Sequence, residues 1–156
     1  MGEPLLVVSD VQTTPEFWRD IHHLYALLAD LRGDYPGFVP WYFDTVVPGV
    51  QHGDREIVVA GSEREIQGIA IVKNTPTEKK ISTLWVAPPA RQAGVGKALL
   101  IKSFDILDTQ HPLMTIPQKK VAQFQSLLDY FGFELADILP NRYRKGQDEH
   151  VFNGTL

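Results

Sequence analysis

The chain has 156 residues, which is enough for one domain of ordinary size but not for two. Hydrophobic residues make up 44% of it and charged residues 22%, a balance that excludes intrinsic disorder. Because 15 Lys and Arg face 19 Asp and Glu, the net charge is −4, and no overall cationic field attracts nucleic acid or anionic lipid. We therefore expect a single domain over residues 1–156 and no nucleic-acid partner.

The absence of cysteine excludes disulfides, thiolate zinc sites and a cysteine nucleophile, and it is compatible with a reducing compartment. The apolar run at residues 5–8 is too short for a signal peptide, and no stretch approaches the roughly 20 apolar residues that cross a bilayer. Five scattered histidines lack the spacing of a metal site. We expect a soluble, cytoplasmic protein without a metal or a membrane partner.

The first half of the chain predicts one strand, one helix and an irregular segment. Residues 5–8 suit a strand, and Thr13 or Thr14 can cap a helix that has Pro15 in its first turn and ends near Gly33. Apolar residues at spacings of about 3 and 4 define one helical face: Phe17, Ile21, Leu24, Leu28 and Leu31. Residues 35–53 are rich in Pro and Gly, with room for one short helix in 41–47, and we expect them to be mobile. Their aromatic cluster comprises Phe38, Trp41, Tyr42 and Phe43, of which one half suits the core and the other an acceptor site.

The second half predicts further strands and two helices. Residues 57–60 and 66–72 read as an antiparallel hairpin, followed by a strand over 80–86. A glycine loop leads into a helix that His111 and Pro112 break, and a strand over 113–116 then runs parallel to the previous strand because a helix separates the two. Pro117 opens a final helix that Gly132 ends. Closing strands are expected at 133–139 and 150–153, joined by a polar loop over 140–149.

The glycine loop between the strand and the helix predicts an anion site. Closely spaced Gly94 and Gly96 let backbone N–H groups converge, and the start of a helix adds unpaired N–H groups and partial positive charge. A nucleoside-triphosphate loop would need Gly at Arg91 and Ser or Thr at Ala98. A dinucleotide fingerprint would need glycine at Leu99, so both of these sites are excluded, whereas a plain strand-to-helix turn stays open as the alternative.

The motif that stays is R-x-x-G-x-G, from Arg91 to Gly96, after a strand that ends at residues 84–86 and before an amphipathic helix that begins near Val95. It resembles the GNAT superfamily of acyl-CoA-dependent N-acetyltransferases, and the resemblance extends over nearly the whole chain, to the Phe-Gly-Phe that ends the final helix. It implies an α/β (α+β) fold. In that fold a mixed, mostly antiparallel central sheet of about six to seven strands has flanking helices, and its fourth and fifth strands are parallel and splayed.

The resemblance also implies that acetyl-CoA (coenzyme A) is the cofactor and that an acetyl group passes directly to a primary amine. Backbone groups of the fourth strand would bind the pantetheine amides: Leu84, Trp85 and Val86. The loop would hold the pyrophosphate: Arg91, Gln92, Ala93, Gly94, Val95, Gly96 and Lys97. Phe124 would flank the thioester, and a fourth-strand N–H would stabilise the oxyanion.

The sequence departs from the family where proton transfer is concerned. Family members often have Asn and Tyr at the positions of Val121 and Leu128, and Tyr130 cannot substitute because two helical residues turn it by about 200°. The catalytic residues are therefore unknown. Candidates are Ser126, Tyr143 and, as a base acting through water, Glu78, each of which can also be a solvated surface residue.

The acceptor is a small-molecule or peptide amine that the sequence does not identify, although the acidic net charge favours a cationic one. A function of another class stays open: a non-catalytic acyl-CoA sensor that regulates a partner protein. The oligomeric state is not determined by the sequence, and the family resemblance is compatible with a homodimer.

Overall fold

The computed structural model describes residues 5–8, 15–62 and 65–156, so the predicted caps Thr13 and Thr14 lie outside the described residues. One mixed sheet organises the chain, in the order β1-β2-β3-β4-β5-β7-β6. Its seven strands are β1 (Leu5–Val8), β2 (Arg55–Gly61), β3 (Ile66–Asn74), β4 (Lys79–Val86), β5 (Leu113–Pro117), β6 (Leu135–Arg144) and β7 (Gln147–Phe152). Among the strands that the structure describes, only β4 and β5 pair in parallel. The predicted fold class is confirmed.

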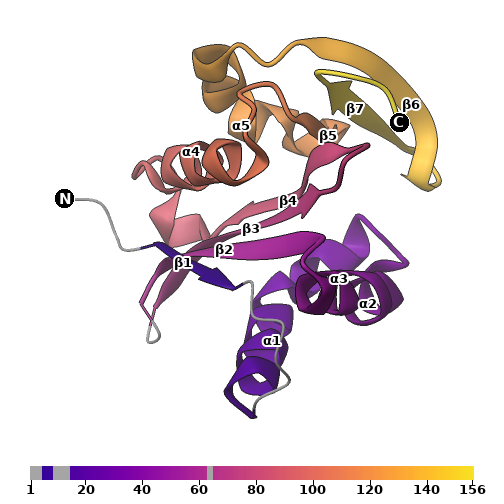
Figure 1. Cartoon of the computed structure of the whole chain (residues 1–156). Coiled ribbons are helices and arrows are strands. Elements are labelled where there is room, and N and C mark those ends of the chain that lie inside the picture. The colour runs from indigo at the N-terminus through magenta and orange to yellow at the C-terminus, as the bar shows by residue number, and fades with distance from the viewer. Residues whose placement is uncertain (1–4, 9–14, 63–64) are drawn as a thin grey trace.

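Helices cover both faces of the sheet (Figure 1). The first layer comprises α1 (Pro15–Leu28), a 3-10 turn (Ala29–Gly33), α2 (Phe38–Trp41), a π-helical turn (Tyr42–Val46) and α3 (Val47–His52). The second comprises a 3-10 turn (Pro88–Ala90), α4 (Val95–Leu107) and α5 (Gln118–Phe131). Among the described helices, none is long and apolar enough to cross a bilayer.

Strict alternation in β2 and β3 divides the core between these two layers. Ile57 and Ile69 face the first layer and pack with Ile21 and Tyr42, whereas Val58 faces the second. All five of these side chains are completely buried. Since successive strand residues point to opposite faces, a sheet buried on both sides needs the continuous apolar runs that the sequence has at these positions.

The strands β4 and β5 separate almost as soon as they meet. They pair only at Lys80 with Leu113 and at Ile81 with Met114. Just beyond this point β4 has a β-bulge, in which Ser82 is the extra residue opposite β3. A bulge bends a strand and increases its twist, so it directs the end of β4 away from β5. The predicted splay is confirmed, and it opens a gap in the middle of the sheet.

Three boundaries differ from the predictions. Residues 38–52 form a continuous helical segment in which Phe38 and Tyr42 are at most 2% exposed, so the segment is longer and better packed than the predicted short helix. The loop predicted over 140–149 is mostly strand, because β6 and β7 form a long hairpin with Gly146 at its turn. The helix α1 ends at Leu28, and a 3-10 turn continues to Gly33.

Candidate functional site

The start of α4 presents a cluster of unpaired backbone N–H groups. Gly94 is the N-cap residue, with φ of 83°, and the preceding turn places Gln92 at φ of 66°. The structure describes the whole of this loop, and no hydrogen bond in it uses five N–H groups: those of Gln92, Gly94, Val95, Gly96 and Lys97. Because such N–H groups lie at the positive end of a helix, they form a cradle suited to a phosphate. We call these five groups the N–H cradle.

The two glycines of the loop have different roles. A Cβ at Gly94 would meet nothing within 4 Å, so this glycine is required by its left-handed backbone alone. A Cβ at Gly96 would come within 2.7 Å of Cδ1 of Leu127, so this glycine lets α4 pack closely against α5. The sequence analysis assigned both glycines to the anion site. Packing between α4 and α5 explains the glycine at position 96 without any ligand, whereas packing does not explain the glycine at position 94.

The two charged side chains of the loop, Arg91 and Lys97, already contact other parts of the protein. Nε of Arg91 lies 3.4 Å from the carbonyl oxygen of Val86, which ties the loop to the end of β4. Nζ of Lys97 lies 4.4 Å from the ring centre of Tyr130 on α5, a cation–π contact. Tyr130 is 65% exposed, whereas Leu128 is buried, which agrees with the prediction that the two residues lie on different faces of the helix. The backbone N–H groups rather than these side chains therefore dominate the chemistry of the cradle.

The end of β4 leaves part of its backbone unpaired. The N–H of Ala87 donates to the carbonyl of Gln67 on β3, at 2.8 Å. Bonded and non-bonded pairs alternate along an antiparallel ladder, so Trp85 is also bonded to β3, whereas Leu84 and Val86 direct their N–H and C=O groups toward the gap. Of the three residues predicted to bind pantetheine, Trp85 therefore does not offer its backbone to the gap, because β3 uses it.

Two cavities meet where β4 and β5 diverge. A narrow one of about 40 Å³ lies between the strands and is lined by Phe124 of α5, which is 6% exposed. A larger one of about 360 Å³ lies toward α2 and the β6–β7 hairpin. Four residues are shared by the linings of the two cavities: Tyr35, Ser82, Thr83 and Thr115. A molecule in the narrow cavity and a second molecule in the larger cavity would therefore meet at these shared residues, which we call the junction.

The fold is similar to that of known proteins, although the sequence is not. No family model matches the chain, and no curated protein matches its sequence. A protein of Desulfovibrio desulfuricans that is classed with the GNAT family of acetyltransferases superposes with a TM-score of 0.70 at 20% identity, over 96% of each chain. The chain has the GNAT fold.

Two further structures share this GNAT fold. A GNAT-family acetyltransferase of Bacillus cereus superposes with a TM-score of 0.62 at 17% identity, over 96% of this chain and 95% of that one. A GNAT-family acetyltransferase of Elizabethkingia anophelis, with acetyl-CoA bound, superposes with a TM-score of 0.54 at 18% identity, over 73% of this chain and 81% of that one. The fold that the sequence resemblance implied is therefore confirmed.

A buried hydrogen-bonded pair lies at the junction of this GNAT fold. The hydroxyl of Tyr35 donates to Oε2 of Glu149 at 2.9 Å, and Glu149 is only 2% exposed. Burial raises the pKa of Glu149, although hydrogen bonds to Tyr35 and Thr115 oppose the shift. Burial and the neighbouring carboxylate also raise the pKa of Tyr35, so its phenol keeps its proton. A carboxylate with a raised pKa is a better proton acceptor than an exposed one.

The turn that carries Tyr35 is fixed by charge. The carboxylate of Asp34 is 2% exposed and pairs with two lysines at the start of α5, with Lys119 at 2.6 Å and with Lys120. Burial alone would raise the pKa of Asp34, but the two lysines outweigh it and leave the pKa below its ordinary value. These ion pairs hold the N-terminal layer against α5 across the gap and so keep Tyr35 at the junction.

The three catalytic candidates from the sequence have different locations. Tyr143 lines the larger cavity and packs edge-on against Tyr35, with ring centres 5.1 Å apart; burial raises its pKa. Glu78 also lines this cavity, where it accepts a hydrogen bond from Lys73 at 3.0 Å. Ser126 is exposed on α5 and lines neither cavity, because it lies two residues from Phe124 and so on another side of the helix.

The sequence reasoning missed Tyr35 and Glu149. They are 114 positions apart, and only the insertion of β7 beside β5 brings them together. One signal was available: Glu149 shares a strand face with the apolar Val151, which is unusual for a carboxylate. The predicted loop over 140–149 hid this alternation.

Proposed function

We propose that this chain binds acetyl-CoA and transfers the acetyl group to a primary amine. The observation that carries the proposal is the N–H cradle at the start of α4, placed beside the free edge of β4. A nest of unpaired N–H groups at a helix start binds a phosphate. The backbone groups of Leu84 and the N–H of Val86, whose carbonyl already accepts from Nε of Arg91, suit the amides of an extended chain. The two features together match the diphosphate and the pantetheine arm of coenzyme A.

The residues predicted to bind the cofactor have positions that fit this assignment. The cradle would hold the diphosphate, with Gly94 as the position that tolerates no side chain without backbone strain. Arg91 adds positive charge at the rim of the cradle. Phe124 forms an apolar wall of the narrow cavity, where the thioester end would lie. The bound thioester supplies an activated acetyl carbon, and the remaining chemistry belongs to side chains of the junction.

The pair of Tyr35 and Glu149 can remove the proton that the attacking amine must lose. An amine of the lysine type has a pKa of about 10.4, so it is protonated at neutral pH and a base has to accept its proton. The hydroxyl oxygen of Tyr35 can accept a proton while its own proton passes to Oε2 of Glu149. An R–NH3+ acceptor loses two protons on the way to the amide, so one would pass to water before the attack and the second, through Tyr35, to Oε2 of Glu149 as the C–N bond forms. The C–S bond would break as the C–N bond forms, and the sulfur would leave as a thiolate with that electron pair.

Acetyl-CoA binding and thiol release test the proposal. A ligand at 100 times its Kd stabilises a protein by about 2.7 kcal/mol, which at about 2–4 °C per kcal/mol predicts a rise in Tm of about 5–10 °C with acetyl-CoA. Thiol release above the protein-free control, on addition of a panel of primary amines, is the expected activity. If acetyl-CoA binds but no amine of the panel releases thiol, the sensor function replaces the enzyme. If acetyl-CoA does not bind, both fail.

A further inference from the structure

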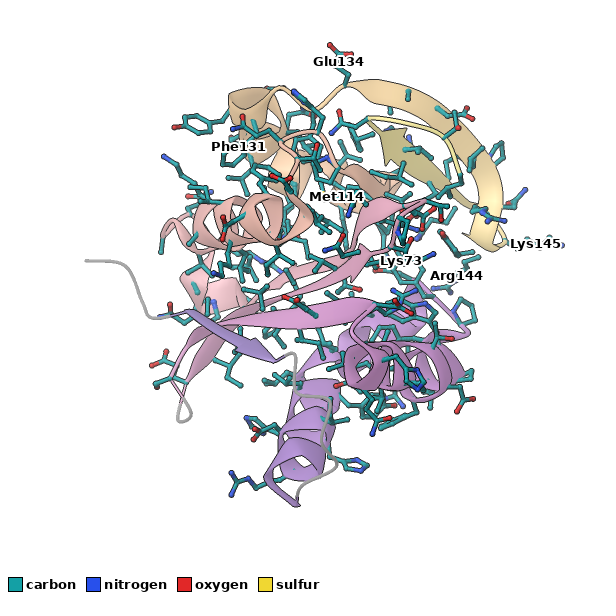
Figure 2. All side chains as sticks on the ribbon, viewed as in Figure 1. Lys73, Met114, Phe131, Glu134, Arg144 and Lys145 are labelled. Atoms are coloured by element: carbon teal, nitrogen blue, oxygen red, sulfur yellow. The ribbon has the colours of Figure 1, made fainter. Side chains whose placement is uncertain are left out.

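The larger cavity has a charge opposite in sign to that of the chain. Three cations line it, Arg55, Lys73 and Lys80, against the single carboxylate of Glu78. Figure 2 shows Lys73 where the ends of β3 and β4 approach the tip of the β6–β7 hairpin, whereas Lys145 points away from the protein at that tip. The net charge of −4 predicted a cationic acceptor, but a ligand responds to the groups that line its site rather than to the sum over the surface.

The guanidinium of Arg55 is held in place, and within residues 5–8, 15–62 and 65–156 one hydrogen bond uses its donors. Its stem passes over Gly49, where a Cβ would come within 2.8 Å of its Cδ. Its Cζ lies 5.7 Å from the ring centre of Trp41, and its Nη1 donates to Oγ of Ser82 at 3.3 Å. Since a guanidinium has five N–H donors, a positioned Arg with one side-chain partner is ready to bind a planar anion through two parallel hydrogen bonds.

The charge of this cavity is only partly balanced by the carboxylates near it. Glu78 is bonded to Lys73, and over the described ranges no carboxylate oxygen lies within 4.0 Å of Arg55 or Lys80. Burial lowers the pKa of Lys80; the charge of Glu78 opposes this shift, Arg55 and Lys73 add to it, and Glu149 opposes it further. Burial likewise lowers the pKa of Arg55. Two half-buried cations that repel each other are stabilised by an anionic ligand.

The rest of the wall is aromatic. Phe38 and Trp41 line the cavity from the first helical layer, and Tyr143 lines it from β6. A volume of about 360 Å³ lies at the small end of the roughly 300–1,000 Å³ typical of small-molecule sites. The cavity therefore combines a cationic floor with an aromatic wall around a space of the size of one small molecule.

We propose that the acceptor is a small amine that also carries a carboxylate and an aromatic or large apolar group, with Arg55 and Lys80 as the residues that bind the carboxylate. This inference rests on the proposed function, because it assigns the larger cavity to the acceptor. It selects the class of apolar amino acids over polyamines, whose several positive charges the cavity would repel.

Binding of matched product analogues tests this inference without any turnover. N-acetyl-L-phenylalanine carries the carboxylate, and N-acetyl-2-phenylethylamine has the same ring and amide without it. Calorimetric titration in the presence of coenzyme A should give at least tenfold tighter binding of the carboxylate compound. Equal affinity of the two compounds, or no binding of either, overturns the inference. Neither result touches the proposed function, which is tested separately by acetyl-CoA binding and by thiol release.

Charge-removing variants assign the effect to the two residues. Arg55→Gln and Lys80→Gln should each remove most of the tenfold preference, while Lys145→Gln, which removes one charge from the exposed hairpin tip, should retain it. Because Arg55 also packs against Trp41, Arg55→Lys is included as a variant that keeps the charge but loses the paired donors. If Lys80→Gln and Arg55→Lys both keep the full preference in folded protein, these residues do not bind the carboxylate.

Discussion

Replacement of Gly94 by alanine separates backbone strain from ligand binding. Gly94 has φ of 83°, and a Cβ there would meet nothing within 4 Å, so the substitution causes no clash. Left-handed backbone costs an L-residue about 1–2 kcal/mol, which corresponds to a decrease in Tm of about 2–8 °C for a chain of this size. Gly146, at the turn of the β6–β7 hairpin, has φ of 82° and equally open surroundings, so Gly146→Ala is a matched control.

The two variants should differ only in their response to acetyl-CoA. In Gly94→Ala either the new Cβ stands beside the N–H cradle or the strained peptide turns its N–H away. Loss of one hydrogen bond to a charged group costs about 1.5–3 kcal/mol, so the affinity should fall about tenfold or more. Gly146→Ala should bind acetyl-CoA as the unmodified protein does. Calorimetry on both variants is the assay, and equal affinities would refute the assignment of the cradle.

Three further predictions concern packing and proton transfer. Gly96→Val should destabilise the protein by about 1–3 kcal/mol in urea unfolding, because its Cβ would come within 2.7 Å of Cδ1 of Leu127 and the added methyl groups extend further; unchanged stability would show that the Leu127 side chain moves aside without cost. Tyr35→Phe should lower acetyl transfer by at least tenfold with acetyl-CoA binding unchanged, whereas Ser126→Ala should leave both as they are; the reverse pattern would remove Tyr35 from the mechanism. In the folded protein the pKa of Glu149 is raised above the ordinary 4.5, so the stability that this carboxyl contributes is present below about pH 4.5 and is lost as the pH rises through the raised pKa. Glu149→Gln should therefore gain unfolding free energy relative to the unmodified protein across this interval, and a constant difference from pH 4 to 8 would contradict the raised pKa.

The sequence predicted the elements whose pattern is local. The strand runs of β2 to β5, the glycine cap at Gly132 and the parallel connection through α4 all follow from periodicity and turn chemistry. The helical segment over 38–52 was underestimated because Pro40 and Pro48 read as breakers. Pro40 lies in the first turn of the segment, where a missing N–H costs little, whereas Pro48 lies inside it, directly after the π-helical turn over Tyr42–Val46.

The site was predictable only in its cofactor half. The cradle is formed by consecutive residues, so its glycine spacing is visible in the sequence. The junction depends instead on Tyr35, Thr115 and Glu149, which come from a turn, β5 and β7 and meet only through the order of the strands. The first half of β6 was predicted as a strand, but its residues 140–144 were predicted as a loop because all of them are exposed, and an exposed edge strand shows no alternation of apolar and polar residues.

The most direct measurement of the central claim follows the backbone amide signals of the protein by NMR during titration with acetyl-CoA. If the N–H cradle holds the diphosphate, the amide protons of Gly94, Val95, Gly96 and Lys97 should show the largest downfield shifts in the spectrum, with those of Leu84 and Val86 also moving. Saturable binding that leaves the cradle amides in place and shifts signals elsewhere would contradict the account.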